Sequence, residues 1–545
     1  MRKWFWWAVG LVLVGAVIRL VVFGHAPGRL AARMAGRGAE TAAYPEPIPN
    51  PPTVPRTDFP RQQPSLAPAV SLAGPPPTAA ALRSAVRNSN IVIVVLDAAR
   101  ADHTGCYGYS RATTPNLDRL ASQSVVFEQH FCQFPCTTPS TVCLLTGQYP
   151  DTHGVGPPTH RSVMASECQV NERTITLERM LGAAGYRTCL FSGNPAASPA
   201  VGVGTGFQYA FPPSGIRPRQ LGAAAGGQRR RESVSILLEK AKEKLRASTG
   251  KPFFFYVHFL PPHNPYSARD EFKALFHDSQ PPGYREGKAA FTEVSKRDRV
   301  AAPPASSVEW VNLYDANLRW ADWAVGELER VLKEAGVFEN TLLIITADHG
   351  EAMREHAYEW HHTCPYDEAI HIPLLIRFPG KQGPVGRATA LTETVDLLPT
   401  IADLYGLAGQ SSPDPASAPQ GKSLVPLLTG SASRVQDYVF CRTGGPWPCY
   451  VVRNHEWALM LYSGGELRAL YDLVADPDQT CNVITEHPEV AAQMAAVFEQ
   501  HAKRQRRPPL EFVDPTYQPP SEPDRPGPAI SEETRRELRA LGYLQ

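Results

Sequence analysis

The sequence has no excess of charge of either sign, because 54 lysine and arginine residues face 53 aspartate and glutamate residues, for a net charge of +1. A protein that binds nucleic acid or another polyanion normally shows a clear basic excess, so this class is disfavoured. No Cys-x-x-Cys pair occurs, which argues against a cysteine zinc cluster, and no internal repeat indicates a solenoid. Only one apolar run approaches membrane-spanning length, which excludes a polytopic membrane protein.

That run extends from Trp4 to Phe23. Residues 1–26 are predicted to be a membrane anchor or a cleaved signal peptide, and both interpretations place the rest of the chain in the periplasm or at the cell surface. Residues 27–87 are predicted to be a linker, because 12 of the 33 residues from Pro45 to Pro77 are proline. Outside the cytoplasm some of the ten cysteines could pair, but their spacing gives no connectivity.

Residues 88–432 alternate between buried-strand and helical patterns, which is typical of an α/β domain with a doubly wound, mostly parallel sheet. Strands are predicted at Asn90 to Asp97, Tyr186 to Phe191, Phe253 to Phe259, Thr341 to Asp348 and His371 to Arg377. Helices are predicted at Pro115 to Ala121, Thr176 to Ala184, Glu232 to Arg246 and Ser307 to Glu334. In such sheets the functional site lies at the carboxyl ends of the strands.

After residue 432 the pattern changes to short strands. Residues 433–510 are predicted to form a small antiparallel subdomain, with a helix near Val490 to Lys503. Residues 511–545 are predicted to be a proline-rich tail that ends in a short helix, Ser531 to Leu544.

Polar residues stand where two apolar strands end, namely Asp97 after one and the pair Asp348–His349 after another. Taken alone, each is also compatible with a loop residue whose side chain only makes hydrogen bonds within the fold. Histidine density strengthens the functional interpretation, because five of the 16 histidines lie within the 23 residues from His349 to His371. Carboxylates and imidazoles at strand ends indicate a metal site or an acid–base site.

Thr137 precedes Pro139, which suits the first turn of a helix. The free backbone N–H groups at such a position bind a tetrahedral anion. Taken alone, Thr137 reads as an N-cap residue, since a hydroxyl there is inert unless a metal or a base activates it.

The ordered combination of motifs is more specific. LDAARAD, then T-x-P-S-x-x-x-LLTG, FLPPHNPY, TADHGE and YDEAIHIPLLIRFPG occur in sequence, and the chain therefore resembles the sulfatase family of the alkaline-phosphatase superfamily. The resemblance extends from about Ile91 into the C-terminal subdomain and implies a metal-dependent ester hydrolase.

Carried over motif by motif, the resemblance implies roles for individual residues. Asp97, Asp348 and His349 would bind one divalent metal ion, with Thr137 as nucleophile and fourth ligand. Three histidines would contact the ester oxygens or protonate the leaving group: His263, His361 and His362. Substrate contacts are also assigned, with less support from the motifs, to His258, His356 and Asn194.

The chain departs from the formylglycine sulfatases that it resembles. Their Cys-x-Pro-x-Arg motif is represented here by Thr137 and Thr141, and Cys136 is one position out of register. Ala98 replaces a second acidic residue, and Asn194 stands near the place of a lysine. Because oxygen ligands are lost and the Asp-His pair adds a nitrogen, zinc or manganese is expected rather than calcium.

Three hypotheses follow from the sequence. The leading one is a hydrolase that cleaves sulfate or phosphate esters through a covalent Thr137 intermediate, acting on a small molecule, glycan or lipid, without a nucleic-acid partner and with N-terminal membrane contact. The second is a phosphotransferase that moves a phosphoryl-linked group onto an envelope lipid or glycan. The third is a binding module that has kept the fold and lost catalysis.

Overall fold

The computed structural model describes residues 70–505, apart from residue 357 and the segments 157–169, 171–173, 212–225, 248–249, 278–280, 282–305, 409–416, 445–447 and 463–466. The expected anchor or signal peptide, most of the linker and the C-terminal tail with its helix lie outside the described residues. Among the helices of the described residues, none combines the length and apolar character that a membrane crossing requires.

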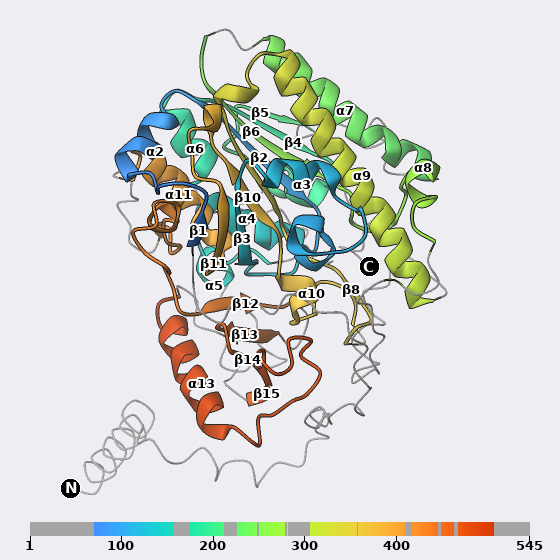
Figure 1. Ribbon diagram of the computed structural model, residues 1–545, viewed down its shortest axis with the longest axis vertical. Coiled ribbons are helices and arrows are strands. Elements are labelled where there is room, and N and C mark those ends of the chain that lie inside the picture. The colour runs from blue at the N-terminus through green and yellow to red at the C-terminus, as the bar shows by residue number, and fades with distance from the viewer. Residues whose placement is uncertain are drawn as a thin grey trace, which may run out of the picture. The chain divides into compact units, whose positions relative to one another are not determined.

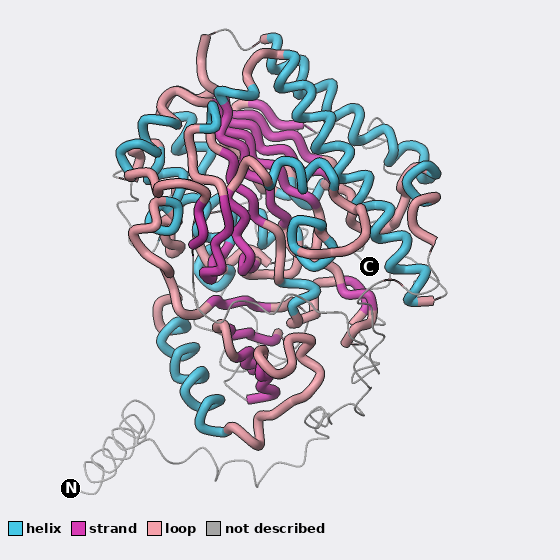
Figure 2. The backbone as a smooth tube through the Cα atoms, viewed as in Figure 1, coloured by secondary structure: helices cyan, strands magenta, loops and turns pink. Residues whose placement is uncertain are grey.

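A nine-stranded sheet forms the centre of the fold, with the order β1-β11-β3-β10-β7-β2-β6-β4-β5 (Figures 1 and 2). Antiparallel pairs occur only where β1 joins β11 and where β10 joins β3 and β7, so the sheet is mostly parallel, as predicted. The strands are β1 (Val70–Leu72), β2 (Asn90–Leu96), β3 (Val125–Phe131), β4 (Arg187–Ser192), β5 (Tyr209–Phe211), β6 (Phe253–Phe259), β7 (Thr341–Ala347), β10 (Leu374–Arg377) and β11 (Gly386–Glu393).

Helices cover both faces of this sheet (Figure 1). On one face lie α3 (Pro115–Ala121), α7 (Gly226–Arg246), α8 (Asp270–Lys273) and α9 (Ser307–Glu334). On the other face lie α2 (Ala79–Ala85), α4 (Thr137–Thr146), α6 (Leu177–Ala183), α11 (Leu397–Leu404) and α12 (Val425–Leu428). Alternate residues of β2 enter the two cores, with Val92 and Val94 in one and Ile91 and Ile93 in the other. Because both faces of β2 are buried, its sequence is an unbroken run of apolar residues after Asn90.

A four-stranded antiparallel sheet follows in the C-terminal part, with the order β12-β13-β14-β15 and helix α13 (Pro488–Ala502) packed against it. Its strands are β12 (Val439–Arg442), β13 (Cys449–Arg453), β14 (Trp457–Tyr462) and β15 (Leu467–Asp472). Hydrogen bonds join the two sheets, because the Arg442 amide donates to the Gln133 carbonyl at 2.9 Å and the Phe440 amide donates to Glu393 Oε1 at 2.8 Å. Short elements complete the chain: α5 (Pro150–His153), β8 (Ala352–Met353), β9 (Glu359–Trp360) and α10 (Asp367–Ile370).

Several boundaries differ from those expected. β10 begins at Leu374 rather than at His371, because Pro373 between them has no N–H to donate to the ladder. α7 begins at Gly226, before the expected Glu232. Thr137 is the first residue of α4 and not the residue that precedes the helix, and Cys136 occupies the N-cap position.

Candidate active site

The carboxyl ends of the parallel strands carry most of the polar residues that the sequence singled out. Asp97 follows β2, Asp348 follows β7, Asn194 follows β4, and His258 is the penultimate residue of β6. β2 lies between β7 and β6 in the sheet, so three of these residues are brought to one edge. Thr137 reaches the same place from α4, which follows β3.

The Asp348 carboxylate is held by backbone groups. Ala98, directly after Asp97, has a φ of +64°, a left-handed conformation that costs an alanine about 1 to 2 kcal/mol. The turn lets the Ala98 amide donate to Asp348 Oδ1 at 3.1 Å, and the His349 amide donates to the same oxygen at 3.0 Å. The other oxygen, Asp348 Oδ2, is buried and makes no hydrogen bond to a described residue. A buried carboxylate oxygen in this state is suited to bind a cation.

Asp97 lies fully buried at the centre of the cluster. Its Oδ2 is 3.0 Å from His258 Nε2 and accepts a hydrogen bond from Asn194 Nδ2 at 2.6 Å. Burial acts to raise the pKa of Asp97, but the nearby imidazoles, above all His263 and His258, outweigh it and hold the pKa at about 2. The site therefore keeps Asp97 ionised at any physiological pH.

The Thr137 hydroxyl lies within the same cluster. Thr137 Oγ1 is 3.3 Å from His349 Nε2 and donates to Asp97 Oδ1 at 3.5 Å. Asn194 Nδ2 donates to Thr137 Oγ1 at 3.4 Å, so this amide bridges the hydroxyl and the carboxylate. Thr137 is the first residue of a ten-residue helix, and the start of a helix is a position where backbone N–H groups can bind an anion.

The orientation of His349 suits metal binding. Its Nδ1 donates to the Gly350 carbonyl at 2.8 Å, which leaves the Nε2 lone pair directed at the cluster. Nε2 lies 3.5 Å from Asp348 Oδ2 and 3.7 Å from Asp97 Oδ1. A backbone carbonyl thus selects the tautomer that a metal requires.

The cluster passes a simple test of fit for a divalent cation. One ligand atom each from Asp97, His258 and Asp348 lie within 4.8 Å of one another, and all three residues are buried. His349 adds a second nitrogen next to them. A compact set of carboxylate oxygens and imidazole nitrogens fits zinc or manganese better than calcium.

His258, expected as a substrate contact, lies among the possible metal ligands. Its side chain is on the same face of β6 as Phe254 and Tyr256, which is the face that α4 covers. The signal in the sequence was a lone histidine near the carboxyl end of a strand that is otherwise apolar.

A group of imidazoles borders the cluster. The His361 ring stacks on His349 with centroids 4.1 Å apart, and lies 5.0 Å from His263 and 4.5 Å from His362. Burial and the neighbouring imidazoles lower the pKa of His361, and they lower that of His362 to about 3. The structure therefore brings all three expected acid or contact histidines to one place.

His356 is engaged differently. Its Nδ1 lies 2.7 Å from Glu368 Oε1, and its Nε2 lies 2.9 Å from the Asp478 carbonyl and 3.1 Å from that of Gln479. Both ring nitrogens are thus occupied by contacts to α10 and to the C-terminal part of the chain. The expected substrate contact is replaced by a structural bridge.

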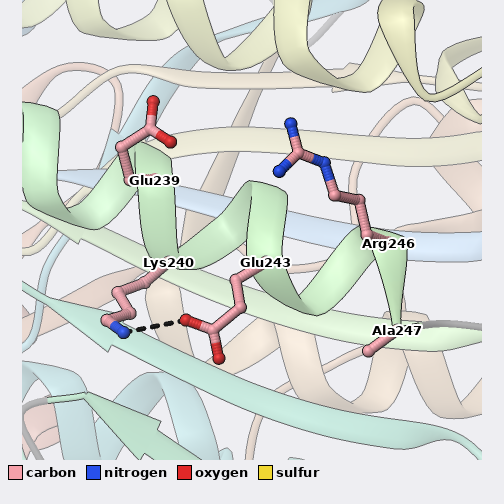
Figure 3. A pocket seen from close by; sticks show the side chains of 5 residues that line it. All are labelled: Glu239, Lys240, Glu243, Arg246 and Ala247. Carbon is pink, nitrogen blue, oxygen red and sulfur yellow. Dashed lines mark hydrogen bonds and ion pairs between the residues drawn. The ribbon is translucent and has the colours of Figure 1, made fainter.

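A separate surface hollow lies along α7 and is lined by Glu239, Lys240, Glu243, Arg246 and Ala247 (Figure 3). Lys240 Nζ is paired there with Glu243 Oε2 at 2.8 Å. α7 covers the sheet face opposite to α4, so this hollow is not part of the cluster around Thr137.

Comparisons with known proteins show the family to which the chain belongs. A family model described as sulfatase matches residues 89–407, and a second, described as N-sulphoglucosamine sulphohydrolase, C-terminal, matches residues 355–506. N-acetylgalactosamine-6-O-sulfatase of Bacteroides thetaiotaomicron is 22% identical over 516 residues, which cover 75% of this chain and 92% of that protein. Iduronate 2-sulfatase of Mus musculus is 26% identical over 408 residues, covering 61% of this chain and 71% of that protein.

The fold is also found in solved structures. Phosphonate monoester hydrolase of Agrobacterium radiobacter superposes with a TM-score of 0.61 at 21% identity, over 76% of this chain and 96% of that chain. A structure of a sulfatase from Bacteroides thetaiotaomicron described as putative superposes with a TM-score of 0.60 at 21% identity, over 77% and 93% of the two chains. The family match spans more than half of the sequence and includes every strand of the large sheet from β2 to β11. The chain therefore belongs to the sulfatase family of ester hydrolases.

Proposed function

We propose that this hydrolase cleaves sulfate or phosphate esters of a small molecule, glycan or lipid through a covalent ester on Thr137. The observation that carries the proposal is the position of Thr137 Oγ1, 3.3 Å from His349 Nε2 and 3.5 Å from Asp97 Oδ1 at the first turn of a buried helix. A hydroxyl that merely capped the helix would not need a carboxylate and an imidazole beside it.

The metal would be held by Asp97, Asp348, His349 and Thr137, and we add His258 as a further ligand because of its place in the cluster. A bound divalent ion supplies two effects, a lower pKa of the threonine hydroxyl and neutralisation of charge on the ester oxygens. Mixed oxygen and nitrogen donors favour zinc or manganese. Asn194 orients both Asp97 and Thr137, which is a positioning role rather than the substrate contact that the sequence indicated.

The chain's own residues would perform the reaction in two steps. The Thr137 hydroxyl gives its proton to water, its Oγ1 forms a bond to sulfur or phosphorus, the bond to the leaving oxygen breaks, and an imidazole among His263, His361 and His362 gives that oxygen a proton. Backbone N–H groups of the first turn of α4 hold the oxygens of the transferred group. In the second step the oxygen of a water molecule forms a bond to sulfur or phosphorus, the bond to Thr137 Oγ1 breaks, the imidazole takes one proton from the attacking water, and Oγ1 takes a proton from solvent to regenerate the hydroxyl.

The relatives support both ester classes. The curated relatives named above act on sulfated sugars according to their names, whereas two structural neighbours are phosphonate monoester hydrolases. The threonine nucleophile in place of the formylglycine cysteine raises the prospect of phosphorus chemistry. We place the enzyme outside the cytoplasm, held by its N-terminal segment or secreted. Its catalytic domain comprises β1 and α2 as well as the expected residues 88–432, because β1 pairs with β11 and α2 packs into the core on one face of the sheet, so the expected linker 27–87 does not extend to residue 87.

A paired screen tests the proposal. Purified protein is assayed with an aryl sulfate, a phosphate monoester and a phosphate diester, its metal content is measured by elemental analysis, and quenched enzyme is digested and analysed by mass spectrometry. We expect turnover of at least one ester class, one metal ion per chain, and a sulfo or phospho adduct on Thr137. Thr137→Ala should fold with an unchanged circular dichroism spectrum and lose turnover. Retained turnover in this variant, or an adduct on another residue, would overturn the mechanism.

A further inference from the structure

Two buried cysteines meet where the C-terminal sheet joins the large sheet. Cys132 directly follows β3, and Cys441 belongs to β12. Their side chains are 0% and 5% exposed, and both are free thiols in this structure. The spacing of the ten cysteines in the sequence gave no connectivity, so the contact between these two is information that the fold adds.

Backbone contacts hold the two segments at the distance of paired strands. The Arg442 amide donates to the Gln133 carbonyl at 2.9 Å, and each of these residues directly follows one of the two cysteines. Segments that are hydrogen-bonded in this way lie about 4.8 Å apart. The Cα atoms of a disulfide are separated by roughly 4.4 to 6.8 Å, so this spacing suits a covalent bond between the segments.

The two side chains also contact each other. The thiols of Cys132 and Cys441 share a hydrogen bond, and both lie in the hydrophobic core on the same face of the sheet. Their other polar contacts are long: Cys132 Sγ is 3.7 Å from the Ala369 carbonyl, and Cys441 Sγ is 3.9 Å from the Arg442 carbonyl. The two sulfurs are therefore neighbours that no strong interaction holds apart.

Two other cysteines near Cys441 are less suited to pair with it. Cys441 lies opposite Val451 in the antiparallel pair of β12 and β13, so Cys449 is its diagonal neighbour. Diagonal neighbours are about 7 to 8 Å apart, which is longer than a disulfide spans. Cys143 of α4 already has a polar partner, because its Sγ is 3.3 Å from His153 Nε2.

We propose that Cys132 and Cys441 form a disulfide that ties the C-terminal sheet to the large sheet. The proposal rests on the location outside the cytoplasm proposed above, because disulfides persist in oxidising compartments. The oxidant is a disulfide of an exchange protein or of glutathione. An S–S bond forms between the two cysteines and the oxidant's S–S bond breaks, so the cysteines give up two electrons and two protons, and the oxidant's sulfurs take them up as two thiols.

Burial indicates when this bond forms. The thiolate is the form of cysteine that reacts with a disulfide. Burial, with the Cys132 thiol beside it, raises the pKa of Cys441 well above its usual 9.0. A buried neutral thiol reacts slowly, so we expect the disulfide to form during folding, before the C-terminal sheet packs against the large one.

The disulfide would also support one side of the active site. The Gly444 amide, shortly after β12, donates to the His362 carbonyl at 2.7 Å. The chain that carries Cys441 therefore holds the backbone of the histidine group as well. Because the bond closes a long loop of chain, it removes conformational freedom from the unfolded state and should raise the melting temperature.

Peptide mapping tests the proposal. The full chain is produced in two bacterial hosts, one with an oxidising and one with a reducing cytoplasm, so that the result does not depend on export. Free thiols are alkylated, the protein is digested without reductant, and the peptides are identified by mass spectrometry. We expect the peptides that hold Cys132 and Cys441 to be cross-linked in most chains from the oxidising host and alkylated in chains from the reducing host.

Thermal unfolding measures the effect on stability. The cross-linked parent should melt at least about 3 °C above the reduced parent. Cys132→Ser and Cys441→Ser should each abolish this difference. The matched control is Cys189→Ser, which should keep it, because this buried cysteine lies on β4, separated from β3 by four strands of the sheet.

Three outcomes overturn the proposal: full alkylation of Cys132 and Cys441 in the oxidising host, a cross-link from either one to Cys143 or Cys449 instead, or equal melting temperatures of the two parent forms. The mapping needs neither activity nor a substituted chain, so it decides the question even where a serine variant does not fold. Failure of the proposed function is a separate result, since it appears as turnover in Thr137→Ala, whatever the state of the cysteines.

Discussion

Thr137 and His349 lie 212 positions apart in the sequence, yet the threonine Oγ1 is 3.3 Å from the imidazole Nε2. Backbone groups hold both partners, since Thr137 is the first residue of α4 and His349 Nδ1 donates to the Gly350 carbonyl. The contact between the proposed nucleophile and the proposed metal ligand is thus built into the framework of the large sheet.

Two substitutions distinguish the role of the Thr137 hydroxyl from the role of the side chain's branched shape. Thr137→Ser keeps the oxygen and Thr137→Val keeps the branched shape of this fully buried side chain. We expect the serine variant to retain kcat within a factor of about 10, and the valine variant to lose a factor of about 10⁴ or more, as for other covalent nucleophiles. Steady-state kinetics on the same ester measure both. Comparable activity in the two variants would mean that the oxygen does not take part.

His258 is expected to contribute to metal binding. Its Nε2 lies 3.0 Å from Asp97 Oδ2 and 3.8 Å from Asp348 Oδ2, so His258→Ala removes one donor of the cluster. The affinity for the metal should fall by at least about 10-fold, which titration of the metal-free protein with zinc or manganese measures. His487→Ala, at a side chain 42% exposed in the C-terminal part, should not alter the affinity. An unchanged affinity in His258→Ala would exclude it as a ligand.

Gly350 sits between His349 and Glu351 where two segments approach closely. A Cβ at this position would overlap the Glu368 backbone oxygen, and the Gly350 amide donates to the Ala369 carbonyl at 2.8 Å. Gly350→Ala should therefore lower the free energy of unfolding by about 1 to 3 kcal/mol and reduce metal affinity, because the carbonyl that orients His349 must move.

The matched control is Gly156→Ala, where an added Cβ meets no heavy atom within 4 Å. This variant should change the free energy of unfolding by no more than about 0.5 kcal/mol and leave metal affinity intact. Chemical denaturation and zinc titration measure the two quantities. A Gly350→Ala variant as stable as Gly156→Ala would contradict the close approach of the two segments.

His356 should make stability depend on pH. Burial acts to lower its pKa, but the charge of Glu368 and the hydrogen bond to it prevail, so the pKa is raised above the usual 6.5. Because the folded state binds this proton more tightly than the unfolded chain, the stabilisation is fully present below pH 6.5 and is lost as pH rises through the folded pKa. His356→Gln, which cannot be protonated, should be less stable than the parent below pH 6.5 by about 1 to 3 kcal/mol.

The comparison is made by denaturant unfolding of both proteins across the pH range, and the difference should narrow at alkaline pH. Glu368→Gln should weaken the same dependence, because it removes the carboxylate that holds the proton on His356. A difference between parent and His356→Gln that stays constant with pH would show that this proton does not contribute.

Strands with both faces buried could be predicted from the sequence almost to the residue. β6 is found at Phe253–Phe259 as expected, and β2 and β7 end one residue before the expected Asp97 and Asp348. In contrast, β3 and β11 were missed, since Glu128, Gln129 and His130 of β3 and the polar residues of β11 break the apolar run. Their place in the sheet depends on neighbours distant in the sequence, as in the parallel pairing of β11 with β3.

The residue types of the site could also be predicted from the sequence, because the acids and the Asp-His pair stand at strand ends in motifs of known order. The residues that contact them could not be predicted in this way. Five histidines crowd residues 349–371, and only the fold separates His361, which stacks on His349, from His356, which contacts Asp478. No rule of sequence spacing distinguishes these two histidines, since they lie only five positions apart in one short segment.

The sequence by itself determined the α/β class, the family and the acids at the strand ends. Strands that are buried on both faces, and motifs that occur in a fixed order, can be recognised from short stretches of sequence. Only the tertiary structure decided that His258 joins the acids, since the parallel register pairs it with Val95 of β2, two residues before Asp97. It alone brought Glu351 Oε1 to 2.7 Å from His361 Nδ1. Such assignments depend on which strands become neighbours, and that choice arises from the packing of the whole sheet and not from any one segment.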